Sequence, residues 1–238
     1  MGANTRNPRS ATASAAGARR QADTTRSLLL CGMSTGPAQL LLSLTQQSWG
    51  DPTPVMNPFV AAGPGWVRAL VLSACGALAI GGAVGLARAL RGRASARSTS
   101  VSVAVYGVCV LLSGVWVIDP MSVPLPGATE AATPMADAAV RTALGWAAPI
   151  ALTRAVLGGS GWMRSTGRGG LVLYSWASAL VAVVGGVLAL AVPTLAGAVA
   201  WTVAVVLWAW LSTLCALVLR DLVPGRHPIP VPPPRRRP

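Results

Sequence analysis

The sequence predicts an all-α, polytopic membrane helix bundle with six transmembrane helices and both termini in the cytoplasm. Hydrophobic residues make up 53% of the 238 residues, and charged residues make up only 11%, whereas soluble domains usually carry about 25% charged residues. The charges lie around long apolar segments, and seventeen of the nineteen basic residues, all of them arginines, fall on one side of this topology. The positive-inside rule assigns that side to the cytoplasm.

Six segments approach the length of about 20 apolar residues that a helix needs to cross a membrane. Their expected spans are 28–44, 69–87, 101–118, 135–157, 171–192 and 196–219. Together they form one domain, 28–220. Residues 1–27 are rich in Ala, Ser, Thr and Arg without apolar periodicity, which indicates a disordered basic tail. Residues 221–238 form a Pro/Arg-rich tail that is also expected to be disordered.

The first segment follows basic residues, which is also typical of a signal peptide. Its exit at residues 45–49 reads TQQSW and lacks a small-residue cleavage site. We therefore interpret 28–44 as an uncleaved crossing that Gly36-Pro37 bends, with a cleaved signal as the alternative.

The second segment contains nineteen uncharged residues between Arg68 and Arg88. Small residues recur in it every four positions, at Ser73, Ala77, Gly81 and Gly85. Such spacing lets helix backbones approach closely, either within one bundle or between two copies in a homo-oligomer. The third segment ends at Asp119-Pro120.

The fourth segment, 135–157, is the most polar, since it contains Asp137, Arg141 and Arg154. Long arginine side chains at its two ends can extend toward opposite membrane surfaces. If this segment did not cross, Arg154 and all arginines after it would lie outside, against the positive-inside rule. We therefore expect residues 135–157 to cross the membrane.

No charge occurs over the fifty-one residues from Gly169 to Leu219. One helix of that length would measure roughly 77 Å, which is far more than a bilayer needs. Pro193 is the expected break, and the two resulting helices should pack as an antiparallel hairpin.

Catalytic, cofactor and metal motifs are missing from the sequence. The single histidine, His227, lies in the C-terminal tail, which excludes a Ser–His triad or an H-E-x-x-H zinc site within the bundle. No catalytic residue, cofactor or metal is therefore expected. The net charge of +13 does not indicate nucleic-acid binding, because the arginines lie around apolar segments.

Four ionisable residues near the expected outer boundary form the candidate ligand site: Asp119, Asp137, Arg141 and Arg68. Ionisable residues at membrane depth are functional candidates. These four could line a shallow polar vestibule for a lipid headgroup or a small solute. The alternative is that they only anchor helix ends at the interface.

Several short motifs occur in an order that resembles a bacterial family called domain of unknown function 998, over about residues 28–220. The motifs are LLLCGMSTGP at 28–37, GPGW at 63–66, GLARAL at 85–90, VIDP at 117–120 and PLPG at 124–127. The resemblance implies a six-helix membrane protein without an established activity. Members often have histidines at the start of the fourth helix, whereas residues 133–139 of this chain contain none.

The expected function is that of a non-enzymatic protein of the bacterial cytoplasmic membrane that binds lipid or another membrane protein. The Arg-rich tails are expected to contact anionic lipids. The alternative is a small-solute or lipid transporter. A polar cavity joining Asp119, Asp137 and Arg141 would favour transport or catalysis, and a solid apolar bundle would favour an interaction role.

Overall fold

A computed structural model describes residues 8–47, 65–92, 94–117 and 133–222. All regular secondary structure in these ranges is helical, as predicted. The elements are α1 (Pro8–Gln47), α2 (Gly65–Ala89), α3 (Ala94–Val117), α4 (Thr133–Ser165), α5 (Gly169–Ala191), the 3-10 helix η2 (Pro193–Leu195) and α6 (Ala196–Asp221).

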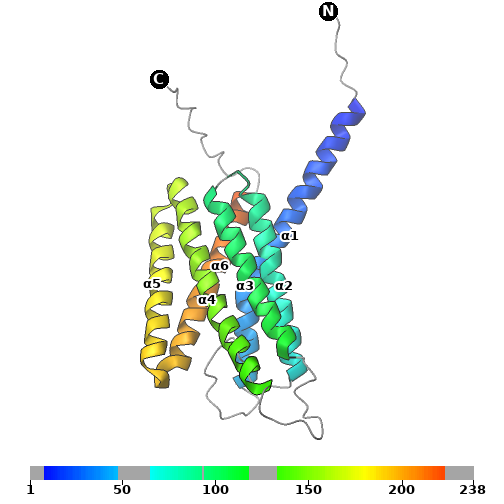
Figure 1. Cartoon of the computed structure of the whole chain (residues 1–238). Coiled ribbons are helices and arrows are strands. Elements are labelled where there is room, and N and C mark those ends of the chain that lie inside the picture. Colours follow the sequence, from blue (N-terminus) through cyan, green and yellow to red (C-terminus); the bar gives the residue numbers. More distant parts are fainter. Residues whose placement is uncertain (1–7, 48–64, 93, 118–132, 223–238) are drawn as a thin grey trace, which may run out of the picture.

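The long helices run up and down in one bundle, so that α1 begins and α6 ends at the same end (Figure 1). Each helix packs against its neighbours in the sequence, and α6 also returns to pack against α1. Contacts of α6 with α2 and α4 place it nearer the middle of the bundle than α5. Two turns at the end where α6 ends use glycines with positive φ, Gly92 (88°) and Gly167 (72°), a conformation that costs other residues free energy.

Four helices are long and apolar enough to cross a membrane within the described residues: Ala69–Ala89, Arg97–Val115, Gly169–Ala191 and Pro193–Asp221. The outside of the bundle is apolar as well. On α5, Leu173 is 73% exposed and Leu190 is 69% exposed, whereas its buried residues are small, such as Ser175 and Gly185. A large exposed aliphatic surface with buried polar residues is what a lipid environment favours. The chain therefore has the character of a membrane-embedded protein.

The N-terminal part of α1 differs from the predicted disordered tail over 1–27, because the helix begins at Pro8. Ala and Arg are frequent in this stretch, and both have high helix propensity. Near the bundle, Arg26 lies 3.6 Å from the Asp23 carboxylate one turn earlier. The high helix propensity of this composition therefore outweighs the lack of an apolar periodicity, which is why the stretch is helical.

The end of α4 also differs from the predicted boundary at residue 157, because the helix continues to Ser165. Glycine often ends a helix, but the glycines in this part of α4 serve for close packing. A Cβ at Gly158 would lie 2.8 Å from Thr99 Oγ1 on α3, and one at Gly159 would lie 2.8 Å from the Trp210 ring on α6. Tertiary contacts thus override the low helix propensity of glycine. Arg154 consequently lies eleven residues before the end of α4, instead of three.

The break near Pro193 and the following hairpin are confirmed. Helix α5 ends at Ala191, and η2 leads directly into α6. Val192 has φ −130° and ψ 84°, so it has left the helical conformation that proline disfavours in the residue before it. The short connection makes α5 and α6 antiparallel neighbours.

Close helix contacts depend on glycines, but not mainly on those of the predicted four-residue pattern. A Cβ at Gly82 would lie 2.5 Å from the Gly32 Cα on α1, and one at Gly76 would lie 2.7 Å from the Gly107 carbonyl oxygen on α3. Of the predicted set, Gly81 and Gly85 do face α1, whereas Ala77 is exposed. The predicted packing within one bundle is thus observed for part of the pattern.

Pro37 removes one hydrogen bond from α1, because its nitrogen cannot donate to the carbonyl of Met33. The hydroxyl of Ser212 on α6 donates to that carbonyl instead, at 2.9 Å. Such replacement by a neighbouring helix is how membrane helices tolerate proline. It also fixes α1 against α6.

Gly82→Ala is expected to lower stability by about 1–3 kcal/mol, the usual cost of overpacking, because the new Cβ would meet the Gly32 main chain. Gly81→Ala is the matched control, since its Cβ would meet the nearest side-chain atom at 3.5 Å, an ordinary contact. Thermal unfolding in detergent can be followed with a thiol-reactive dye, because Cys75, Cys109 and Cys215 are buried. Equal unfolding temperatures for the two variants would contradict the proposed contact.

Candidate functional site

The four residues of the predicted outer vestibule are only partly placed by the structure. Arg68 lies near the start of α2, and Asp137 and Arg141 lie in the first turns of α4. Both helices start at the same end of the bundle (Figure 1). Only the main chain of these three residues belongs to the described structure, and Asp119 lies outside it. The vestibule therefore stays a prediction.

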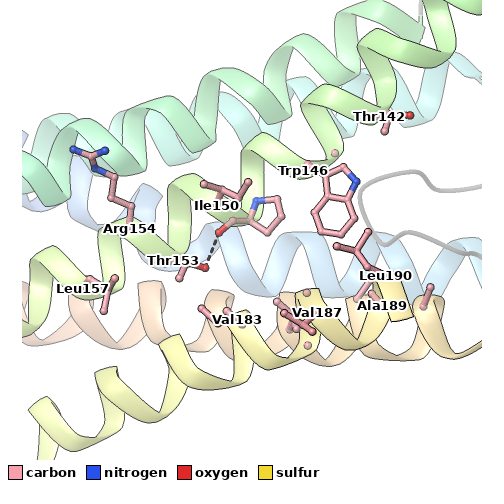
Figure 2. A pocket seen from close by; sticks show the side chains of 18 residues that line it. Thr142, Trp146, Ile150, Thr153, Arg154, Leu157, Val183, Val187, Ala189 and Leu190 are labelled. Carbon is pink, nitrogen blue, oxygen red and sulfur yellow. Dashed lines mark hydrogen bonds between the residues drawn. The ribbon is translucent and has the colours of Figure 1, made fainter. Parts of the chain in front are cut away.

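The described residues form an apolar groove of about 780 Å³ between α4 and the α5–α6 hairpin. Its walls are shown in Figure 2, where Trp146 of α4 points toward Leu190 of α5. Ile150 of α4 and Val187 of α5 also line it. Trp146, Ile150 and Leu190 are also exposed on the outside of the bundle. The groove thus opens sideways, toward the surface that a membrane would cover.

Small residues create this groove. Gly185 packs so closely that its Cβ would overlap Val203 of α6, which brings the two hairpin helices together. The adjacent Gly186 lines the groove, and a Cβ there would meet nothing within 4 Å. On the opposite wall, Gly145 and Pro149 of α4 leave further space. The hollow is therefore a consequence of residue size on both walls.

Polar groups occur mainly at the two ends of the groove, Thr142 toward one end and Arg154 toward the other (Figure 2). Between them, the Thr153 hydroxyl donates to the Pro149 carbonyl at 2.8 Å and so is already satisfied. Among the described residues, no cluster of three or more His, Cys, Asp or Glu side chains is suited to a metal ion. This arrangement suits a hydrocarbon chain better than a reacting polar substrate.

A second hollow, of about 760 Å³, lies between α3 and α4. Arg97, Ser98 and Ser102 of α3 line it, and it shares Ile150 and Arg154 of α4 with the apolar groove. Figure 2 shows the Arg154 side chain pointing away from α5. The stem of Arg154 thus borders the groove, while its guanidinium extends on the side of the second hollow.

A buried hydrogen-bonded chain crosses three helices. The Trp208 indole Nε1 on α6 donates to the Tyr106 hydroxyl on α3 at 2.9 Å, and that hydroxyl donates to Gln39 Oε1 on α1 at 2.8 Å. Gln39 is 4% exposed, and the other two are 1% or less. Sequence reasoning missed this chain, although Gln39 and Tyr106 are polar residues within apolar segments. Because its side chains are buried and hydrogen-bonded to one another, this chain holds α1, α3 and α6 in position.

The arginine-rich end of the bundle is held by an ionic contact. Arg168 Nη2 donates to Asp221 Oδ1 at 2.6 Å, and the Arg168 guanidinium lies 5.6 Å from the centre of the Trp162 ring. Arg26 Nη2 donates to the Leu222 carbonyl at 3.3 Å. These contacts connect α1, α4, α5 and α6 where the helices leave the apolar region.

Comparisons with family models, with curated proteins and with solved structures give no match to this chain.

Tyr106→Phe is expected to lower stability by about 1–2 kcal/mol, because it removes both hydrogen bonds of the buried chain without changing its shape. Tyr174→Phe is the matched control, since Tyr174 is partly exposed on α5. Thermal unfolding in detergent measures both variants. If Tyr106→Phe unfolded at the same temperature as Tyr174→Phe, the buried chain would not contribute to helix packing.

Proposed function

We propose that the chain is a six-crossing protein of the bacterial cytoplasmic membrane with both termini inside. Four helices meet the length and hydropathy of a crossing, and α1 and α4 each pack between two of those four. The packing supports counting α1 and α4 as crossings, despite Pro37 in one and the charges of the other. The proposed inner end carries Arg164, Arg168 and Arg220, in agreement with the positive-inside rule.

We also propose that the chain belongs to the bacterial family called domain of unknown function 998. This proposal rests on the order of the short sequence motifs, and an up-and-down bundle of six helices is compatible with it. That family has no established activity, so membership supports only the six-helix topology. The functional proposal rests on the groove.

The proposed function is non-enzymatic binding of a membrane lipid, with an acyl chain in the groove between α4 and the α5–α6 hairpin. The observation that carries this proposal is the apolar lining of the groove together with its opening on the exposed flank of α4 and α5. Within a bilayer, lipid tails are as apolar as the groove walls, so the hydrophobic effect does not drive binding. Retention of the lipid then depends on close packing and on polar contacts at the ends of the groove.

A small-solute or lipid transporter is the second candidate. Pro149 favours it, because this residue interrupts the hydrogen-bonding pattern of α4 beside the groove and could allow the helix to bend. However, the interior that the structure describes is mainly apolar, and its polar residues Tyr106 and Gln39 are hydrogen-bonded to each other. A polar path across the bundle is not seen in that part, so lipid binding is preferred.

The topology predicts that single cysteines or reporter fusions placed at residues 95, 125 and 165 report inside, outside and inside. Membrane-impermeant thiol labelling of whole cells against lysed cells measures this directly. An outside result at residue 165 would remove α4 as a crossing and would contradict the six-helix arrangement.

Gly186→Phe is expected to reduce the lipid that co-purifies with the protein about tenfold, because the aromatic ring would fill the groove. Gly170→Phe is the matched control: it changes the same helix at a glycine whose Cβ also meets nothing within 4 Å, and Gly170 does not line the groove. Native mass spectrometry measures the bound lipid. Equal retention by the two variants would show that the groove is not the acyl-chain site.

A further inference from the structure

Two arginines, Arg97 and Arg154, line the hollow between α3 and α4. Both are exposed. The two carboxylates that the structure describes, Asp23 and Asp221, pair with Arg26 and Arg168 instead. The hollow therefore concentrates positive charge without a balancing anion from the described part of the chain.

The depth of Arg154 makes this charge unusual. About 16 Å of helix separates it from the end of α4 at Ser165, and Arg97 lies near the start of the antiparallel helix α3. A Cβ at Gly158 would lie 2.8 Å from Thr99 Oγ1, so Arg154 is opposite a part of α3 that lies about 9 Å deeper than Arg97. The long side chain of Arg154 extends back over this distance to the hollow that it shares with Arg97. A guanidinium at this depth extends toward the interface or attracts polar groups to itself.

The two hollows meet at Arg154 and Ile150, which line both. A ligand that occupies them together would have an apolar chain on one side of α4 and an anionic group on the other. Arginine binds phosphate oxygens through charge-assisted hydrogen bonds, and its planar fork can form two of them at once. The Ser98 and Ser102 hydroxyls in the same hollow add polar character beside that anion.

We propose that Arg97 and Arg154 bind the phosphate of an anionic phospholipid whose acyl chain lies in the α4–α5–α6 groove. The inference rests on the proposed function and adds the headgroup class. The charge of the hollow selects a headgroup with net negative charge, since a zwitterionic lipid would bring a cationic group next to two arginines.

The test is a competition between phosphatidylglycerol and phosphatidylcholine with identical acyl chains. The full-length protein is purified in detergent, incubated with an equal mixture of the two lipids, and examined by native mass spectrometry. Wild type is expected to retain phosphatidylglycerol about tenfold better, the equivalent of one charge-assisted hydrogen bond. Arg97→Gln/Arg154→Gln is expected to retain both lipids equally, and Arg97→Lys/Arg154→Lys is expected to keep most of the preference.

Arg88→Gln/Arg91→Gln is the matched control, because it removes the same charge from two exposed arginines that line neither hollow. It should keep the tenfold preference. Absence of a preference in wild type, or a preference that survives Arg97→Gln/Arg154→Gln, overturns the headgroup assignment. In that case Gly186→Phe still tests the proposed function separately, because it should reduce retention of both lipids alike. If Gly186→Phe retains as much lipid as wild type, the groove is not the acyl-chain site, and the headgroup inference fails with it.

Discussion

The contact between the main chains of α1 and α2 at Gly32 and Gly82 is the constraint on which the rest of the bundle depends. No side chain separates the two helices at this point, so α1 lies deep enough for its polar groups to reach other helices. The carbonyl of Met33 then accepts the Ser212 hydroxyl, and Gln39 accepts the Tyr106 hydroxyl. In a lipid environment, where the hydrophobic effect does not drive helix association, such close packing and interhelical hydrogen bonds supply the cohesion.

The α5–α6 hairpin uses the same small-residue packing for a different purpose. Its buried face on α5 consists of Ser, Ala and Gly, so this helix contacts α6 closely, while large aliphatic side chains cover its outer face. Next to Gly185, which makes the contact, Gly186 leaves space. One pair of adjacent glycines therefore joins two helices and opens the wall facing α4. Adding a side chain at the first would separate the hairpin, whereas adding one at the second would fill the groove.

The positions of most helices depend on the composition of long segments and can be predicted from the sequence. Features that depend on packing between helices cannot be predicted in this way. Segment lengths and the arginine asymmetry indicate the helices, and the length of the uncharged stretch 169–219 with Pro193 near its middle locates the hairpin. The sequence places the end of α4 too early, because contacts of Gly158 and Gly159 with other helices keep these glycines helical. The groove and the Gln39–Tyr106–Trp208 chain depend on which faces of separate helices meet, and helices without strong amphipathicity do not reveal that. The candidate residues Arg68, Asp119, Asp137 and Arg141 follow from charge and from the expected outer boundary, and their side chains lie outside the described structure.

The extension of α4 to Ser165 has a consequence for the membrane itself. It places Arg154 eleven residues before the end of α4, instead of the three residues that the expected boundary implied. Arg154 lies on the exposed wall of the bundle, next to the aliphatic residues Ile150 and Leu157. A guanidinium there keeps its hydration by drawing water and headgroups inward, which deforms the nearby leaflet. The bilayer beside α4 should thus be thinner than beside α5, whose 23 residues carry no charge. Such a protein would accumulate preferentially in regions where the membrane is already thin. Because the hydrophobic thickness differs between the α4 side and the α5 side, neighbouring membrane proteins would also prefer one side over the other.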